Sequence, residues 1–415
     1  MNITRIWQAL SLMAAMVVSG TNVYAAPSVS QSPAEEIAEL DKLLTQIDRA
    51  LDAKDSLEPF LYATSALNSK IDVFEIRFGV PLQTQPQWEA LRGKAEKVLK
   101  RVDGRHRNDI YFNADSAETG TCVLIELAGN PTTALKRLDQ IKPGGGCGNW
   151  AASVMLAVNT QKAGIYQRKG DYKQAYASMK AARDDMVFAL GAPASDLFCC
   201  RYAFLAGKNG EVEEAKKFYQ RVVDLYPKTD GDQIARKALT AMGSLTEPDL
   251  QRIRRVYLEE KEIRDYDAAI FAIAGHKFPG AYDFLVEQLA SAENFERNRL
   301  IPALGVLGDR RALPVLKKIT QESKDNANTV HALVALARLG DREEVVPCLK
   351  RQLDAKSDIF FNGYWLDASL REIYGDGPER LEMGATLEMT PAKLAQRWLT
   401  WIESRKVPAV EQKSA

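Results

Sequence analysis

The chain has 415 residues, and its 55 lysines and arginines balance its 55 aspartates and glutamates, so the formal net charge is zero. No global field therefore favours nucleic acid or an anionic membrane, and the length suits two or three ordinary domains or one long array. The five cysteines show no disulfide-framework spacing, so we expect most of them to be small buried residues.

Residues 1–25 have the composition of a secretory signal. Arg5 precedes the ten-residue apolar run ALSLMAAMVV, and Val23 and Ala25 suit the small-residue positions of a cleavage site. The run is shorter than the ~20 residues needed to span a bilayer. We expect cleavage after Ala25 and a periplasmic or secreted protein without an integral membrane segment, with an uncleaved anchor as the alternative. Cleavage leaves 54 basic and 55 acidic residues, a net charge of −1.

Residues 26–104 are predicted to form an N-terminal helical segment. Apolar residues three and four apart line one face of SPAEEIAELDKLLTQIDRALDAKD, with Ser32 as its cap. A second amphipathic helix is predicted over PQWEALRGKAEKVLKRV. Residues 70–84, which include IDVFEIRFGVPL, fit either a short strand or a bent helix, and both remain open.

Residues 105–230 contain a motif that recurs about every 40 residues, a spacing visible at Gly129, Gly170 and Gly210. Each glycine follows a small residue by seven positions and precedes an alanine by five. Small residues at these places let two antiparallel helices approach closely. The residues are Cys122, Ala163 and Ala203 before the glycines, and Ala134, Ala175 and Ala215 after them.

This motif resembles the tetratricopeptide repeat, through GDYKQAYASMKAA and GEVEEAKKFYQRVVDLYP. The resemblance implies stacked helical hairpins that bind a protein or peptide. The Lys and Asn positions that clamp a peptide carboxylate in some family members are not matched. On that face the third copy has Leu197, Cys200 and Phe204 instead, so Leu197 and Phe204 are candidate partner-binding residues.

Residues 231–375 show a second rhythm, with Gly243, Gly275, Gly308 and Gly340 separated by 32 or 33 positions. Each glycine lies between two runs with helical apolar spacing, so each is expected to end the first helix of a hairpin. LGDRRALPVL and LGDREEVVPCL resemble the HEAT repeat, in the short form of phycobilisome-lyase-type proteins. The resemblance implies a HEAT-like array.

Four basic residues follow the prolines of these two motifs by three and four positions. They are Lys317, Lys318, Lys350 and Arg351. Stacked repeats would align them into a basic ridge on the second helices, where an acidic partner can dock. The alternative is a row of solvated side chains without a partner.

Residues 376–405 are predicted to hold a capping helix, TPAKLAQRWLTWIESRK, after a helix that ends at Gly375 or Gly377. Trp398 and Trp401 lie three apart on one face and are expected to seal the last hairpin, since a terminal repeat must protect the core. An aromatic binding platform is the alternative. Residues 406–415 are predicted to be a mobile tail.

The sequence shows no recognisable catalytic motif. The three histidines show no metal-ligand spacing. The phrase PGGGCGNW could activate the thiol of Cys147 at a helix N-terminus, but no histidine base is recognisable, so a connector between hairpins is the favoured interpretation. Whether Cys147 forms a disulfide stays open. No catalytic, cofactor-binding or metal-binding residue is predicted.

Together these patterns predict an all-α protein, an α-solenoid of helical hairpins in which tetratricopeptide-like repeats precede HEAT-like ones. The expected function is that of a non-catalytic exported scaffold or adaptor with a protein or peptide partner and no nucleic acid. The alternative is an enzyme or enzyme-maturation factor of the cell envelope, similar to a cell-wall hydrolase or a lyase, built on the same solenoid.

Overall fold

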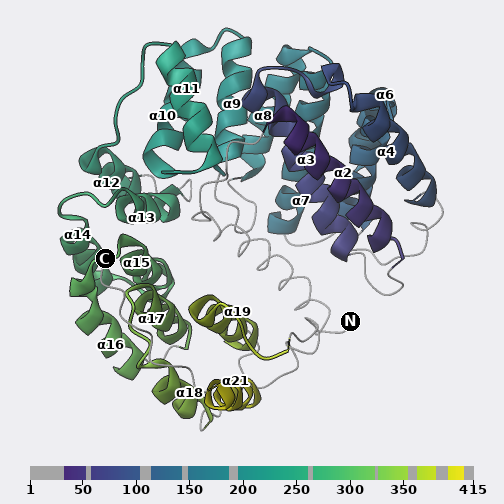
Figure 1. Cartoon of the computed structure of the whole chain (residues 1–415). Coiled ribbons are helices and arrows are strands. Elements are labelled where there is room, and N and C mark those ends of the chain that lie inside the picture. The colour runs from purple at the N-terminus through teal and green to yellow at the C-terminus, as the bar shows by residue number, and fades with distance from the viewer. Residues whose placement is uncertain are drawn as a thin grey trace. The chain divides into compact units, whose positions relative to one another are not determined.

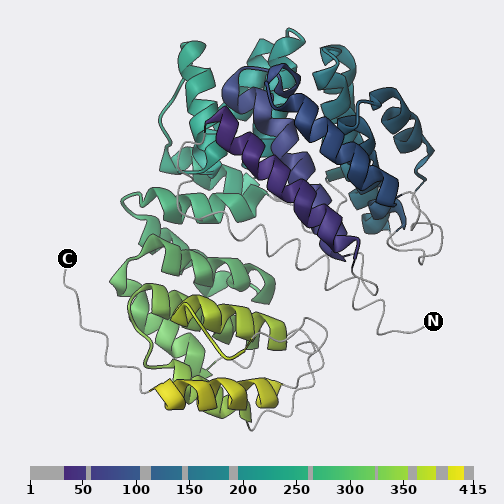
Figure 2. The same cartoon turned by 45° about the vertical axis from the view of Figure 1, so that its right-hand side comes forward.

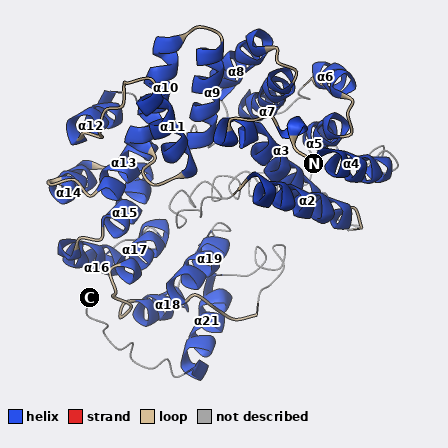
Figure 3. Cartoon of the chain, turned by 45° about the horizontal axis from the view of Figure 1, so that its top comes forward, coloured by secondary structure: helices blue, strands red, loops and turns tan. Residues whose placement is uncertain are grey.

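The computed structural model describes most of the chain between residues 32 and 405. Within that part every regular element is a helix and no strand occurs, which confirms the predicted all-α fold (Figures 1 and 3). The described ranges are 32–52, 58–102, 114–142, 148–186, 195–259, 265–322, 326–353, 362–379 and 391–405. The predicted signal, the predicted tail and Cys147 lie outside them.

The helices form two compact units, each a stack of helical hairpins. The N-terminal unit contains α2 (Pro33–Ala50), α3 (Glu58–Phe78), the 3-10 turn η2 (Leu82–Thr84), α4 (Trp88–Val102), α5 (Ala114–Leu127), α6 (Pro131–Gln140), α7 (Gly148–Arg168), α8 (Tyr172–Met186), α9 (Asp196–Lys208), α10 (Val212–Leu225) and α11 (Asp230–Ala241).

The C-terminal unit contains α12 (Leu250–Glu259), α13 (Asp265–His276), α14 (Ala281–Ser291), α15 (Asn294–Leu307), the 3-10 turn η4 (Arg310–Ala312), α16 (Leu313–Glu322), α17 (Asn326–Arg338), α18 (Val345–Leu353), α19 (Asn362–Tyr374) and α21 (Pro391–Arg405). Within this unit α12, α14, α16 and α18 form one row and α13, α15, α17 and α19 another (Figure 1). The predicted boundary between the two repeat types, after residue 230, stays a prediction.

The hairpins of the N-terminal unit share one turn geometry, which explains their glycines. Gly129, Gly170 and Gly210 have φ between 75° and 89°, in the left-handed region. In each turn the next residue donates its amide to the carbonyl five positions earlier, at 2.9 to 3.0 Å. Because this Schellman-type closure needs a left-handed residue, glycine ends the first helix of each hairpin.

Three of the four glycines predicted to end the first helices of the HEAT-like hairpins also take the left-handed conformation. Gly243, Gly308 and Gly340 have positive φ. The prediction for Gly275 is wrong, because α13 continues through it to His276. Lys277 takes the left-handed conformation instead, with φ 55°.

Small residues sit where the hairpins approach most closely. Cys122, Ala163 and Ala203 have no exposed surface, and neither do the alanines that follow the turn glycines, Ala134, Ala175 and Ala215. This burial confirms the predicted role of the motif. Larger side chains at these positions would separate the helices, because the interior is already close-packed.

The open question over residues 70–84 is resolved as helix. Helix α3 continues to Phe78, and the chain then turns at Gly79 into η2. At the start of α2 the predicted cap is also present, since Ser32 and Glu35 form a reciprocal capping box.

Helix α21 closes the C-terminal unit as predicted. Trp398 is fully buried among residues of α17, α18 and α19, and its indole Nε1 donates to Asp367 Oδ1 at 2.9 Å. Trp401 is only partly buried and packs edge-on against Trp398 and Tyr374. The preceding helix ends at Gly375, which has positive φ, while Gly377 touches Trp398.

Gly305 marks a close contact between two helices of the C-terminal unit. A Cβ added there would lie 2.7 Å from the Cα and 2.9 Å from the Cβ of Ala335 on α17. Because the nearest atom belongs to the backbone, α15 and α17 would have to separate. We expect Gly305→Ala to lower the free energy of unfolding by about 1–3 kcal/mol in urea denaturation followed by circular dichroism.

A matched glycine supplies the control for this experiment. Gly93 lies inside α4, and an added Cβ there would meet nothing within 4 Å. Gly93→Ala is therefore expected to raise the free energy of unfolding by about 0.5–1 kcal/mol, through helix propensity alone. A destabilising Gly93→Ala, or a neutral Gly305→Ala, would contradict this account of the packing.

Candidate functional site

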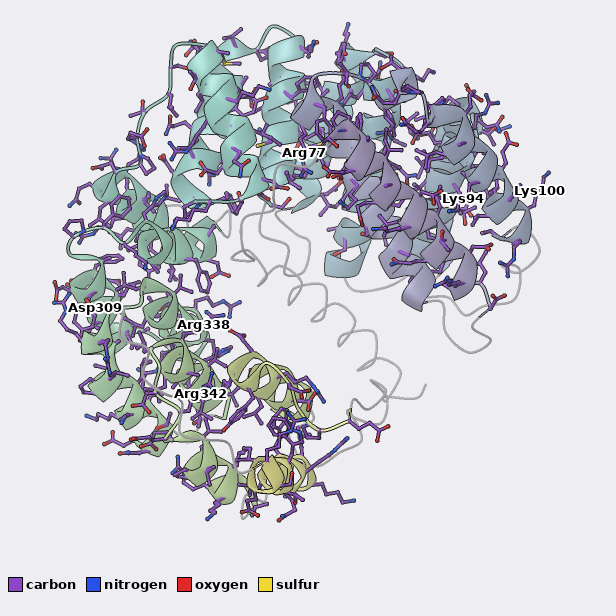
Figure 4. All side chains as sticks on the ribbon, in the orientation of Figure 1. Arg77, Lys94, Lys100, Asp309, Arg338 and Arg342 are labelled. Carbon is purple, nitrogen blue, oxygen red and sulfur yellow. The ribbon has the colours of Figure 1, made fainter. Side chains whose placement is uncertain are left out.

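Helix α3 lies across α5, α7 and α9, the first helices of the three tetratricopeptide-like hairpins. Its end then reaches α11, the helix that follows them. Thr64 faces Gly120 on α5, and near the other end Arg77 pairs with Asp230 on α11. Figure 2 shows the purple N-terminal helices in front of the teal ones, and Figure 4 labels Arg77 near this crossing.

We call the surface that these helices turn towards α3 the first-helix face. Its members are Gly120, Gly164, Arg168, Arg201 and Asp230. It is the candidate site because it combines residues of these four helices with the largest group of buried charges among the described residues.

Buried ion pairs hold the middle of α3. Asp72 Oδ1 accepts from Arg168 at 2.8 Å, and its Oδ2 accepts from Arg201 at 2.5 Å. Arg168 also forms a two-point contact with Glu126 of α5, at 2.5 and 2.7 Å. The side chains are 3% to 9% exposed, so these charges are partnered inside the protein rather than by solvent.

The two arginines respond differently to their burial. Desolvation lowers the pKa of Arg201, and the attraction of Asp72 offsets this only in part. For Arg168 desolvation also acts to lower the pKa, but the charges of Glu126 and Asp72 outweigh it and raise the pKa. Both guanidiniums stay protonated in any case, since arginine does not titrate in proteins. The network is thus a fixed set of charges.

Two mid-helix glycines make room for α3. A Cβ on Gly164 of α7 would lie 2.2 Å from Asp72 Oδ1, and a Cβ on Gly120 of α5 would lie 2.7 Å from Thr64 Oγ1. Glycine inside a helix costs about 1 kcal/mol relative to alanine. Helices α5 and α7 are therefore less stable by this amount at the two glycines, where α3 lies close to them.

A second polar group binds the last turns of α3. Glu75 accepts hydrogen bonds from Gln167 at 2.9 Å and from the hydroxyl of Tyr172 at 3.1 Å. Burial, followed by the charge of Glu75, raises the pKa of Tyr172. Arg77 bridges to Glu36 of α2 at 3.1 Å as well as to Asp230.

The predicted residues Leu197 and Phe204 lie on α9 beside this network, one turn on either side of Arg201, and both are half-buried. The ring of Phe204 packs edge-on against Tyr172, with the centroids 6.2 Å apart, and Lys208 lies 5.4 Å above the Phe204 ring. Their role as partner-binding residues stays a prediction.

Cys200, expected on the same face, is fully buried, and its thiol donates to the Gly231 carbonyl at 3.3 Å. It therefore points towards α11.

The predicted basic ridge joins neighbouring second helices of the C-terminal unit. Arg351 of α18 donates to the Thr320 carbonyl of α16 at 2.8 Å. Lys317 lies 2.8 Å from Asp341, and 71%-exposed Lys318 lies 3.8 Å from Glu322.

Lys350 is also exposed. Carboxylates therefore compensate part of the ridge charge, and its binding role stays a prediction.

The cysteines among the described residues are unreactive because they are buried. Cys122, Cys199, Cys200 and Cys348 are buried free thiols, as expected from the sequence. Burial raises the pKa of Cys122 and Cys199 to about 12, and it also raises the pKa of the other two. A thiol with such a pKa is protonated at pH 8 and unreactive.

This predicts the outcome of a thiol titration. In a Cys147→Ser variant, which retains the four buried cysteines, Ellman's reagent at pH 8 should find no reactive thiol in the native protein and all four in 8 M urea. A thiol that reacts natively at the rate of free cysteine would show that one of these sites opens.

In the described part of the chain, no group of three or more His, Cys, Asp or Glu side chains is arranged to hold a metal ion. No helix there combines the length and apolarity needed to span a bilayer.

Sequence reasoning did not find the network around Asp72. The available signal was a single charge inside a short, otherwise apolar stretch of a helix, as with Asp72 in IDVF and Arg201 in CCRYAFL. Such a charge is buried only when a distant segment supplies its partner, and Asp72 and Arg201 are 129 positions apart.

Comparison with known proteins supports the repeat type. A family model described as tetratricopeptide repeat matches residues 198–229, which cover most of α9, all of α10 and the turn that follows. No curated protein and no solved structure matches the chain.

Proposed function

We propose that this chain is a non-catalytic scaffold of the tetratricopeptide-like type, which binds a protein or peptide partner. The observation that carries the proposal is the matched hairpin α9–α10, set within a stack whose turns and small residues repeat its geometry. Repeat stacks of this kind present long surfaces, and such surfaces serve protein recognition.

The docking surface that we favour is the basic ridge of the C-terminal unit. Contacts between α16 and α18 support a continuous ridge, since Arg351 and Thr320 join the two helices. Lys318 and Lys350 are exposed and supply its available positive charge. The matching partner is an acidic protein segment, and charge complementarity of this kind acts mainly on the association rate.

The experiment is affinity purification of the tagged full-length protein from its native host, followed by mass spectrometry. We expect a captured protein with an acidic segment, and we expect Lys318→Glu with Lys350→Glu to reduce its capture at least tenfold. Reversal of Lys97 and Lys100, two exposed lysines of α4 in the N-terminal unit, is the matched control and should leave capture unchanged. Equal capture by the ridge variant would show that docking occurs elsewhere.

The proposal includes export. It rests on the signal-like composition of residues 1–25. Mass spectrometry of the mature chain should find Ala26 at its N-terminus, in the periplasmic or secreted fraction. A chain that keeps residues 1–25 would contradict cleavage.

The HEAT-like nature of the C-terminal hairpins is likewise part of the proposal, supported by the glycine spacing and the two-row arrangement within that unit.

A further inference from the structure

We propose that the first-helix face is a helix-binding surface and that α3 occupies it permanently, as an intramolecular ligand. Because α3 blocks this face, external partners bind elsewhere on the protein. Asp72 is the residue that fixes the position of α3 on this face. The inference does not depend on the proposed scaffold function, and its test requires no external partner.

Apolar burial shows that α3 belongs to a core and is not a segment bound at the surface. Phe60, Leu67 and Phe74, spaced seven apart on one side of the helix, are at most 1% exposed. They belong to one core with residues of α2, α4 and α5. A surface-bound segment that exchanges with a partner would bury much less of its apolar side.

The charges specify one position along the face. Asp72 reaches Arg168 and Arg201 from two different helices at once. A shift of α3 by one turn would bring Asn68 or Ile76 to the two arginines and leave buried positive charge without its carboxylate. The ion pairs of Asp72 with Arg168 and Arg201 therefore disfavour other positions of α3 along the face. One buried polar residue fixes the register of a coiled coil in the same way.

The glycines show that the face is shaped for this occupant. Gly120 and Gly164 lie at the crossing points of α3, and any larger residue there would collide with Thr64 or Asp72. Two helices thus give up intrinsic stability where α3 requires the space, and at Gly164 the guanidiniums of Arg168 and Arg201 share that space with Asp72. The ligand class that fits the face is an amphipathic helix with a carboxylate at the Asp72 position, and α3 is that helix.

The test releases α3 from the chain without removing it. Protease sites are inserted into the full-length protein within residues 53–57, which link α2 to α3, and at exposed Val80. After cleavage at both sites, α3 should co-elute with the rest of the protein in gel filtration. With Asp72→Asn the apparent affinity should fall at least ~100-fold, so that the peptide is lost.

The matched control is Asp41→Asn on α2, a carboxylate that is 53% exposed and paired with Lys94. This variant should retain the cleaved peptide as the wild type does. Loss of α3 from the cleaved wild type, or full retention with Asp72→Asn, would overturn the proposal.

A cross-link covers the case in which Asp72→Asn does not fold. A Cβ on Gly120 would lie 3.2 Å from Thr64 Cβ, close to the ~3.5–4.5 Å of a disulfide. In a Cys147→Ser background, Thr64→Cys with Gly120→Cys should form a disulfide that keeps the cleaved α3 attached on a non-reducing gel. Failure of the pair to oxidise in the native protein would mean that α3 does not occupy this face.

Peptide binding to the uncleaved protein tests whether α3 blocks the first-helix face. A fluorescent peptide of residues 58–78, added in excess to the uncleaved protein, should not bind, because the face is already filled. Incorporation of the peptide would show that the face is open to external helices and would overturn the inference.

Discussion

Replacing Arg168 by methionine is expected to lower the free energy of unfolding by about 3–5 kcal/mol, because it removes one partner from a buried ion network. Arg168 is 7% exposed and contacts both Asp72 and Glu126. Methionine fills much of the volume but leaves the Glu126 carboxylate, 9% exposed, without its two hydrogen-bond donors. Urea denaturation measures the loss, and hydrogen exchange should localise it to α3, α5 and α7.

A double-mutant cycle separates the pair from the packing. Since replacement of a whole buried pair by apolar residues is often neutral, Arg168→Met combined with Glu126→Leu should recover much of the stability that Arg168→Met loses. Additive losses in the double variant would mean that the two residues are not coupled.

The surface control for this prediction is Arg101→Met on α4. Arg101 also contacts two carboxylates, Asp48 and Asp52, each at 2.5 Å, but it is 40% exposed. Water and salt screen such pairs, so the loss should be far smaller than that of Arg168→Met and should shrink further in 1 M salt. If both variants lowered the free energy of unfolding by a similar amount, the ion pairs of Arg168 would be no more buried than those of Arg101.

Replacing Trp398 by alanine is expected to lower the stability of the C-terminal unit by about 3–5 kcal/mol. The side chain has no exposed surface and lies among residues of α17, α18 and α19, so its removal opens a large cavity at the end of the stack. Asp367 also loses the indole donor, although Arg371 still contacts it at 2.8 Å. Hydrogen exchange should show faster opening of α18, α19 and α21.

Two further variants give this prediction its controls. Trp398→Phe keeps most of the apolar volume and should lose less than Trp398→Ala. Trp401→Ala removes a partly buried ring and should cost less than half as much. If Trp401→Ala proved the more damaging of the two alanine variants, the sealing role would belong to Trp401.

A closed first-helix face changes where partners should be sought. Helix α3 contacts α5, α7, α9 and α11, so the surface that these helices share is already occupied by the chain itself. Leu197 and Phe204 lie beside that contact, whereas the ridge lysines lie in the other unit. Variants of the two sets therefore test two separate surfaces.

The sequence by itself determined the local units of this protein. Turn glycines such as Gly170 and Gly340, and small residues such as Ala163, specify helix ends and close approaches through backbone and steric rules that act within one hairpin. That is why the all-α fold, the hairpins and the Trp398 cap were predictable. The Gly275 prediction was wrong because Lys277, which carries no such signature, took the left-handed conformation.

Only the tertiary structure decided what α3 does. Its sequence fits a strand or a helix in part, and nothing local says that it crosses four other helices. The contact joins Asp72 to Arg201 across 129 positions, and a charge pair has no period that a sequence can display. Coulomb attraction and close packing depend on distance in space, so the occupant of the first-helix face appears only once the hairpins are stacked.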